Sequence, residues 1–274
     1  MDEALVLREV AERVVAEAAE FVRRRRPEVF GTAGAVRSPS GLTAVRSKST
    51  RTDPVTIADT ETERLVRERL AVLRPGESIL GEEQGGDDAG SGAVRWVVDP
   101  IDGTVNFVYG IPAYVVSLAA QVDGTSIAGA VADVCSGEIY SAALGGGASI
   151  IEGGMRRSLR CNDVSELSMA LVGTGFGYQP ERRAVQAALL AQMLPLIRDV
   201  RRVGAAALDL CMVAAGRLDA HYEHGLNVWD WAAGALIAAE AGAVVRLPDR
   251  PDGLLIAAAP GIAAELGEAL RRFS

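Results

Sequence analysis

The segment WVVDPIDGTVNF, at residues 96–107, combines residue types that could carry out chemistry. An apolar run ends at Asp99, a proline interrupts strand pairing, and Asp102, Gly103 and Thr104 follow directly. Two carboxylates this close repel each other unless they are protonated or bridged by a cation. The glycine allows the backbone to approach an anion closely. The spacing therefore predicts a site for a cation and an anion at the end of a buried strand, and the alternative is an Asx turn with a capping aspartate.

Two other acidic segments could join this site. Glu82 and Glu83 end a short apolar run, and because adjacent strand residues face opposite sides, we expect only one of them to enter a site. Asp230 lies between two tryptophans at the start of an apolar helix. The alternatives are solvent exposure for both glutamates and helix capping for Asp230.

The ligand types indicate the ion. Neither histidine nor cysteine accompanies the carboxylates, and all-oxygen sites select hard cations, chiefly Mg²⁺ with Mn²⁺ or Ca²⁺ as competitors. Bound Mg²⁺ suits the transfer of a phosphoryl group to water. A competing metal pair, His221 with His224, falls in a strand and turn rather than on one helix face, which disfavours it. Lys48 is the only lysine among 28 lysine and arginine residues, a hint of a site that needs a compact ammonium group.

The elements that must position these residues follow from periodicity. Helical spacing predicts a first helix over 4–22, stopped at Pro27, and a second over 58–73. Next come strand-like segments with turns at Asp123-Gly124 and Ser136-Gly137, which predict a largely antiparallel sheet: 78–82, 96–99, 114–121, 126–134 and 139–143. From about residue 159, strands at 170–173, 200–203, 220–223, 243–247 and 254–258 alternate with helices at 182–196, 205–216, 230–241 and 262–272, an α/β pattern. We therefore divide the chain into halves, 1–158 and 159–274, that share one compact body.

Composition excludes several classes of protein. Of 274 residues, 49% are hydrophobic and 23% charged, as in ordinary globular proteins. A net charge of −8 and 5% aromatic content disfavour a nucleic-acid-binding face. Three widely spaced cysteines, an acidic N-terminus and the lack of a long apolar run predict a cytoplasmic protein without a membrane span.

The motifs together resemble those of the inositol monophosphatase family. The resemblance rests on Glu82-Glu83, on DPIDGT followed by Asn-Phe, on WDxAAG at Asp230, and on the segment KSTRTDPVTIAD at residues 48–59. It implies a layered αβαβα sandwich, dependence on two to three Mg²⁺ ions, inhibition by Li⁺ and a homodimer.

The resemblance also assigns metal ligands and catalytic groups. Glu82, Asp99 and the Ile101 carbonyl would bind the first ion, and Asp99, Asp102 and Asp230 the second. A third, weaker ion would lie near Glu82, which we therefore count among the catalytic residues. Asp59 and Thr104 would form a dyad that activates the attacking water. The amides of Gly103 and Thr104 would bind the phosphate. Lys48 would lie on a loop near the third ion.

Substrate contacts are implied as well. Asp102, Glu223 and Asp230 would bind substrate hydroxyl groups, and the Gly204-Ala205-Ala206 turn would line the pocket. Ala205 departs from the family, in which many members have a hydroxyl residue there. The implied reaction is hydrolysis of inositol monophosphate, a small phosphate monoester, by in-line attack of a metal-activated water.

Other functions are compatible with parts of the pattern. Related phosphatases act on histidinol phosphate, fructose 1,6-bisphosphate or 3′-phosphoadenosine 5′-phosphate, and some relatives are regulatory binding proteins. A haloacid-dehalogenase mechanism would need a D-x-D pair, whereas the spacing here is D-x-x-D. Because the chain contains every expected carboxylate, we favour catalysis.

Overall fold

The computed structural model describes residues 3–31, 45–47, 54–86 and 89–273. Lys48 lies outside these residues. In the described part of the chain, no helix is long and apolar enough to cross a membrane. Residues Val45–Ser47 and Pro54–Thr56 form a small antiparallel pair, β1 and β2, ahead of the main sheets.

The larger sheet has, within the described residues, seven strands in the order β3-β4-β5-β6-β7-β8-β9. Only β3 and β4 run parallel there; the other neighbours are antiparallel. The strands are β3 (Ser78–Gly81), β4 (Val94–Asp102), β5 (Val115–Val122), β6 (Thr125–Asp133), β7 (Ile139–Ala143), β8 (Gly147–Glu152) and β9 (Met155–Ser158). The largely antiparallel half predicted from the sequence is confirmed, whereas the β8–β9 hairpin was not predicted.

The smaller sheet is mixed and has five strands among the described residues, in the order β11-β10-β12-β14-β13. β10 pairs in parallel with β11 and β12, while β14 is antiparallel to β12 and β13. The strands are β10 (Leu171–Thr174), β11 (Asp199–Arg201), β12 (Ala220–His224), β13 (Val244–Arg246) and β14 (Leu254–Ala258). This sheet and its helices confirm the predicted α/β half.

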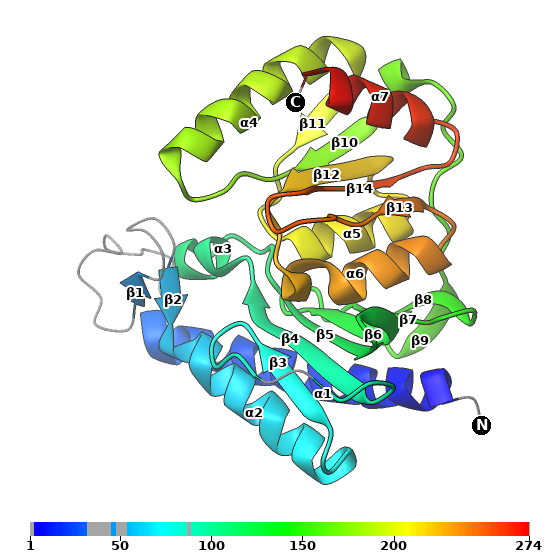
Figure 1. Ribbon diagram of the computed structural model, residues 1–274. Helices are drawn as coiled ribbons and strands as arrows, with labels where there is room; N and C mark the ends of the chain where they lie inside the picture. The colour runs from blue at the N-terminus through cyan, green and yellow to red at the C-terminus, as the bar shows by residue number, and fades with distance from the viewer. Residues whose placement is uncertain (1–2, 32–44, 48–53, 87–88, 274) are drawn as a thin grey trace.

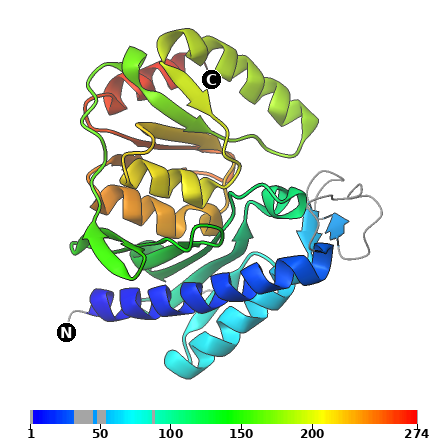
Figure 2. The same cartoon turned by 180° about the vertical axis from the view of Figure 1, so that it is seen from behind.

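Helices fill the remaining layers (Figures 1 and 2). α1 (Glu3–Phe30) and α2 (Ile57–Leu73) cover the outer face of the larger sheet. α5 (Ala206–Ala214) and α6 (Val228–Glu240) lie between the two sheets and contact both. α4 (Pro180–Met193) and α7 (Ala263–Phe273) form the outermost layer. The order of layers is the predicted αβαβα sandwich.

The two halves of the chain share apolar cores. One core joins β4–β8 to α5 and α6, so side chains from both halves pack in a single cluster. The larger sheet ends with β9 at Ser158, where the sequence places the boundary. The division of the chain into 1–158 and 159–274 stays a prediction.

Pro27 does not stop α1, contrary to the expectation from sequence. The helix continues to Phe30, with Pro27 inside it. Tertiary contacts hold the last turn: the Phe30 ring meets Phe107 edge-on at 5.5 Å, and Arg26 Nε donates to the Phe107 carbonyl at 2.9 Å. These contacts offset the hydrogen bond that the proline cannot donate. Arg23 and Arg25, which precede the proline, also donate hydrogen bonds within the protein, to the Val134 carbonyl and to Glu61.

Candidate active site

The end of β4 delivers the first carboxylates. The strand is buried from Trp96 to Asp102 because helices cover both faces of the sheet. Pairing with β5 shifts register between Asp99 and Asp102, around a proline that has no N–H to donate. The Ile101 amide donates to Asp99 Oδ1 at 3.0 Å. An Asx-type turn, which the sequence offered as an alternative to a site, is therefore present at Asp99, and it orients a carboxylate that also lines a cavity.

Asp102 caps a helix from another part of the chain. Ala207 N donates to Asp102 Oδ2 at 2.7 Å, at the first turn of α5. The residue before that helix, Ala205, has no side chain able to cap it. The β4 carboxylate thus satisfies backbone groups at the start of α5, which joins the two sheets at the site.

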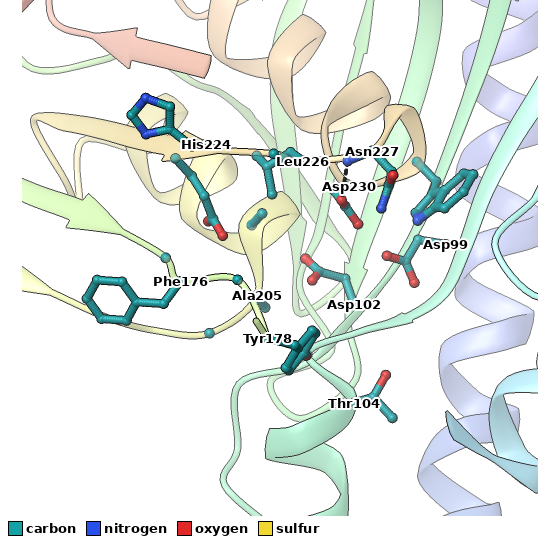
Figure 3. A pocket seen from close by; sticks show the side chains of 18 of the residues that line it. Asp99, Asp102, Thr104, Phe176, Tyr178, Ala205, His224, Leu226, Asn227 and Asp230 are labelled. Atoms are coloured by element: carbon teal, nitrogen blue, oxygen red, sulfur yellow. Dashed lines mark hydrogen bonds between the residues drawn. The ribbon is translucent and has the colours of Figure 1, made fainter. Parts of the chain in front are cut away.

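Asp230 combines the two functions weighed for it from sequence. It is the third residue of α6, and its Oδ2 accepts from the Asn227 amide at 2.6 Å in a capping box. Its carboxylate also faces the cavity, toward Asp99 and Asp102 (Figure 3). Capping and participation in the site are therefore not alternatives.

These residues line one cavity of about 580 Å³ between the two halves of the chain. The larger sheet contributes Glu82 and the residues of the β4 end, and the C-terminal half contributes Asp230 with the opposite wall. The lining contains the following residues singled out from sequence: Glu82, Asp99, Ile101, Asp102, Gly103, Thr104, Gly204, Ala205, Ala206, Glu223 and Asp230. The structure thus brings together nearly all of the predicted site.

The carboxylates of the cavity raise each other's pKa. Burial raises the pKa of Asp99 and Asp230 well above the usual range, and charges on the neighbouring carboxylates raise both further. Burial raises the pKa of Asp102 to about 7, although hydrogen bonds from the α5 backbone oppose this. Like charges in one buried site favour either protonation or a bridging cation.

The donors present fit a hard divalent cation. The side chains and the carbonyl predicted as ligands from the sequence offer carboxylate and carbonyl oxygens, which Mg²⁺ prefers. In the described ranges, no three His, Cys, Asp or Glu side chains already lie in an arrangement that could hold a metal ion.

Asp59 and Thr104 form the predicted pair beside the carboxylates. Asp59 lies on α2 and is fully buried, and Thr104 Oγ1 donates to its Oδ1 at 3.1 Å. Thr56 is the N-cap of α2, and its amide (at 2.8 Å) and its hydroxyl both donate to the other carboxylate oxygen of Asp59, Oδ2. One oxygen of Asp59 is thereby engaged by the helix cap, and the other is directed to Thr104.

Glu223 lies at the opposite wall with a buried polar group behind it. Burial raises the pKa of Glu223 to about 8. His221 Nε2 lies 3.6 Å from Glu223 Oε2, and its Nδ1 lies 3.9 Å from Asp209 Oδ2. His224 lines the cavity, but its ring is turned away from the aspartates (Figure 3). His221 is fully buried and does not line the cavity, so the cavity does not bring the two histidines together as a metal pair.

Sequence reasoning missed several residues of the cavity wall. Arg182 and Arg202 line it, and Arg182 is paired with Asp252. In a chain so rich in arginine, neither carries a distinguishing signal. Asn227 was also missed, although the Asn-x-x-Asp spacing before an apolar helix is a readable capping signal.

Comparison with known proteins agrees with this geometry. The profile described as the inositol monophosphatase family matches residues 4–272. An inositol-1-monophosphatase of Mycobacterium leprae is 64% identical over 98% of this chain and 94% of its own length. The solved structure of Mycobacterium tuberculosis SuhB superposes with a TM-score of 0.85 at 58% identity, covering 100% of this chain and 99% of that one.

A relative with lower sequence identity is not named as a phosphatase. A protein of Pasteurella multocida named Nus factor SuhB is 39% identical over 80% of this chain and 82% of its own length. The full-length match to the family profile, the relatives and the shared fold lead to one conclusion: the chain belongs to the inositol monophosphatase family of phosphatases.

Proposed function

We propose that the protein hydrolyses inositol monophosphate to inositol and phosphate with Mg²⁺ as cofactor. The main support is the convergence of Asp99 and Asp102 from the end of β4 with Asp230 of α6, beside the Asp59–Thr104 pair. The names of the mycobacterial relatives support the choice of substrate. Two to three ions, Li⁺ inhibition, a cytoplasmic location and a homodimer remain expectations of the same proposal.

In this proposal the carboxylates hold the cations. Glu82, Asp99 and the Ile101 carbonyl would hold one ion. Asp99, Asp102 and Asp230 would hold another, and a third would lie near Glu82. When bound, the ions lower the pKa of water and neutralise charge on the phosphate. Lys48 would act near the third ion.

Asp59 and Thr104 accept the proton of the attacking water. The Thr104 hydroxyl has one proton and two acceptors nearby, Asp59 Oδ1 at 3.1 Å and the Ile101 carbonyl at 3.0 Å. When it donates to Asp59, its lone pairs remain to accept from water. As the water attacks phosphorus, its proton passes to Thr104 and the Thr104 proton passes to Asp59. The phosphorus–ester oxygen bond breaks, and the departing alcohol takes a proton from solvent.

The other wall would hold the substrate. The amides of Gly103 and Thr104 bind phosphate oxygens, and the Gly204–Ala206 turn lines the pocket. Asp102, Glu223 and Asp230 bind hydroxyl groups, which suits a polyol. Gly103 has a φ of +92°, and a Cβ there would lie 2.9 Å from the Ala113 carbonyl, so another residue would strain this turn.

One observation favours a second candidate substrate. Arg182 and Arg202 add positive charge to the cavity wall that Glu223 shares. A substrate with a second phosphate, such as fructose 1,6-bisphosphate or 3′-phosphoadenosine 5′-phosphate, would pair with them. Histidinol phosphate has no such group to offer.

Phosphate release from these four substrates, with and without Mg²⁺ and Li⁺, tests the proposal. We expect Mg²⁺-dependent turnover, fastest with inositol 1-phosphate and reduced by Li⁺. Asp99→Asn should abolish turnover in a folded protein, because it removes a carboxylate shared by two ions. Thr104→Ala should lower kcat about 10²–10³-fold while Mn²⁺ binding is kept. Near-normal activity of the Asp99 variant, or an effect of the Thr104 variant on KM alone, would contradict the assignments.

A further inference from the structure

One face of α2 serves the site at two points. Asp59 holds Thr104, and Glu63, one helical turn later, reaches the segment that carries Glu82. Both α2 carboxylates are fully buried. The wall that holds the attacking water and the loop that supplies a metal ligand are thus attached to the same helix.

Glu63 binds the backbone directly after Glu82. Its Oε2 accepts from the Glu83 amide at 2.7 Å, and its Oε1 accepts from the Gln84 amide at 3.2 Å. Arg67, one turn further along α2, donates from Nε to Glu63 Oε1 at 2.9 Å. Two consecutive backbone amides therefore point into one carboxylate, whose charge Arg67 balances.

Arg67 also joins the two ends of this segment. Its guanidinium donates to the Gly85 carbonyl and, at 3.4 Å, to the Ile79 carbonyl in β3. Gly81 and Gly85 exchange backbone hydrogen bonds of 2.9 and 3.0 Å, which close the loop on itself. The loop is therefore held at both ends and in the middle from α2.

The loop sequence is fitted to the Glu63 carboxylate. A Cβ on Gly81 would lie 2.2 Å from Glu63 Oε1, so only glycine leaves room for the carboxylate. Gly86 has a φ of +154°, and a Cβ there would lie 1.9 Å from the Ile79 carbonyl. A buried ion pair gives little net stability compared with apolar packing, because its charges lose their hydration. Its value here must lie in the position that it fixes.

We propose that Glu63, together with Arg67, is a positioning residue that holds the Glu82 backbone in register with Asp59 and Thr104. The proposal rests on the proposed function in one respect, that Glu82 binds a catalytic cation. Partners of metal ligands typically change metal affinity 10- to 100-fold when they are removed. Loosening this loop should weaken cation binding and leave the Asp59–Thr104 hydrogen bond in place.

Mn²⁺ binding to the full chain, followed by electron paramagnetic resonance without substrate, tests this directly. In Glu63→Gln one of the two acceptor oxygens becomes an NH₂ group, which cannot accept a hydrogen bond. If it replaces Oε2, the bond from the Glu83 amide is lost, and if it replaces Oε1, the bonds from Arg67 and the Gln84 amide are lost. We expect Mn²⁺ to bind at least one site 10- to 100-fold more weakly. The matched control is Glu61→Gln on the same helix, because Glu61 pairs with Arg25 of α1 instead of the loop. Its Mn²⁺ affinity should stay within twofold of the wild type.

Two further measurements separate positioning from loss of structure. Raising Mg²⁺ should restore most of kcat to Glu63→Gln, which a merely misfolded fraction would not show. If that variant does not fold, Arg67→Met keeps the Glu63 carboxylate and its bonds to the Glu83 and Gln84 amides. It removes the Arg67 bonds to Glu63, Gly85 and Ile79, and it should weaken Mn²⁺ binding 3- to 10-fold. The positioning role would be overturned if both variants bound Mn²⁺ with wild-type affinity. If Glu63→Gln does not fold, wild-type Mn²⁺ affinity of Arg67→Met alone would overturn it. In either case the phosphatase assignment would stand. Absence of Mn²⁺ binding by the wild type would overturn both.

Discussion

Protonation of His221 should make the free energy of unfolding of the metal-free protein depend on pH. Substitution of this one residue should remove its contribution to that dependence. The ring is fully buried, and burial lowers its pKa from 6.5 to about 3. The groups facing it are Asp209 on α5 and Glu223 on β12, and burial raises the pKa of both carboxyls, that of Glu223 to about 8. Burial therefore sets the pKa of the ring and keeps the imidazole neutral at pH 7.

The magnitude follows from proton linkage. The unfolded chain takes up a proton on His221 near pH 6.5, whereas the folded chain does so only near pH 3. The contribution to stability is therefore complete above pH 6.5 and is lost as pH falls from there toward 3. Between pH 7.5 and 5.5 this residue alone should lower the free energy of unfolding by about 1.4 kcal/mol.

Urea unfolding in EDTA at these two pH values measures the effect. His221→Phe keeps a ring of similar shape and removes two nitrogens that have no hydrogen-bond partner among the described residues, so it should fold. Between pH 7.5 and 5.5, the free energy of unfolding of His221→Phe should fall by about 1.4 kcal/mol less than that of the wild type. The chain has only two histidines, so His224→Gln is the control and should retain the His221 contribution. Equal losses in the wild type and His221→Phe would refute the assignment of a neutral buried imidazole.

Two other substitutions test separate parts of the structure. Glu12→Gln removes a buried carboxylate that accepts from Arg8, Ser141 and Arg156, and it should lower the free energy of unfolding at pH 7 by about 2 kcal/mol in urea titrations. Because hydrogen bonds and charge from these arginines lower the pKa of Glu12 despite its burial, the difference from wild type should shrink as pH falls through that pKa. Gly175→Ala would place a Cβ 2.0 Å from Glu223 Oε2, so KM for inositol 1-phosphate should rise about 10-fold with Mn²⁺ binding unchanged; an unchanged KM would contradict the role of Glu223.

The strand-end aspartates could be predicted because local chemistry defines them. An apolar run followed by Asp-Pro indicates where the pairing of a buried strand is interrupted, and β4 shifts register there. These signals depend on neighbours in sequence, so they survive without knowledge of the fold. The same holds for Asp230, whose capping box lies within four residues.

Other features could not be predicted because distant segments decide them. Pro27 stays inside α1 through contacts that Phe30 and Arg26 make with α3 (Thr104–Tyr109). The β8–β9 hairpin is glycine-rich at its start and fully exposed along β9, so it lacks the apolar alternation that identifies strands. Glu63 lies on the buried face of α2 with Asp59 and Val66, as helical periodicity indicates. Its hydrogen bonds to the loop after β3 depend on a distant segment that this periodicity does not identify.

The site reconciles stability with a cluster of buried carboxylates by giving two of them structural hydrogen bonds. Asp102 accepts from the α5 backbone and Asp230 from the turn before α6, both helices lying between the sheets. Each bond favours the charged form, and so opposes the cost of burial that raises the pKa of these groups. Because α5 and α6 contact both sheets, capping these helices also fixes the two halves of the chain relative to each other at the cavity. The arrangement explains how buried carboxylates from β4 and α6, which are distant in sequence, can face one another across the cavity (Figure 3).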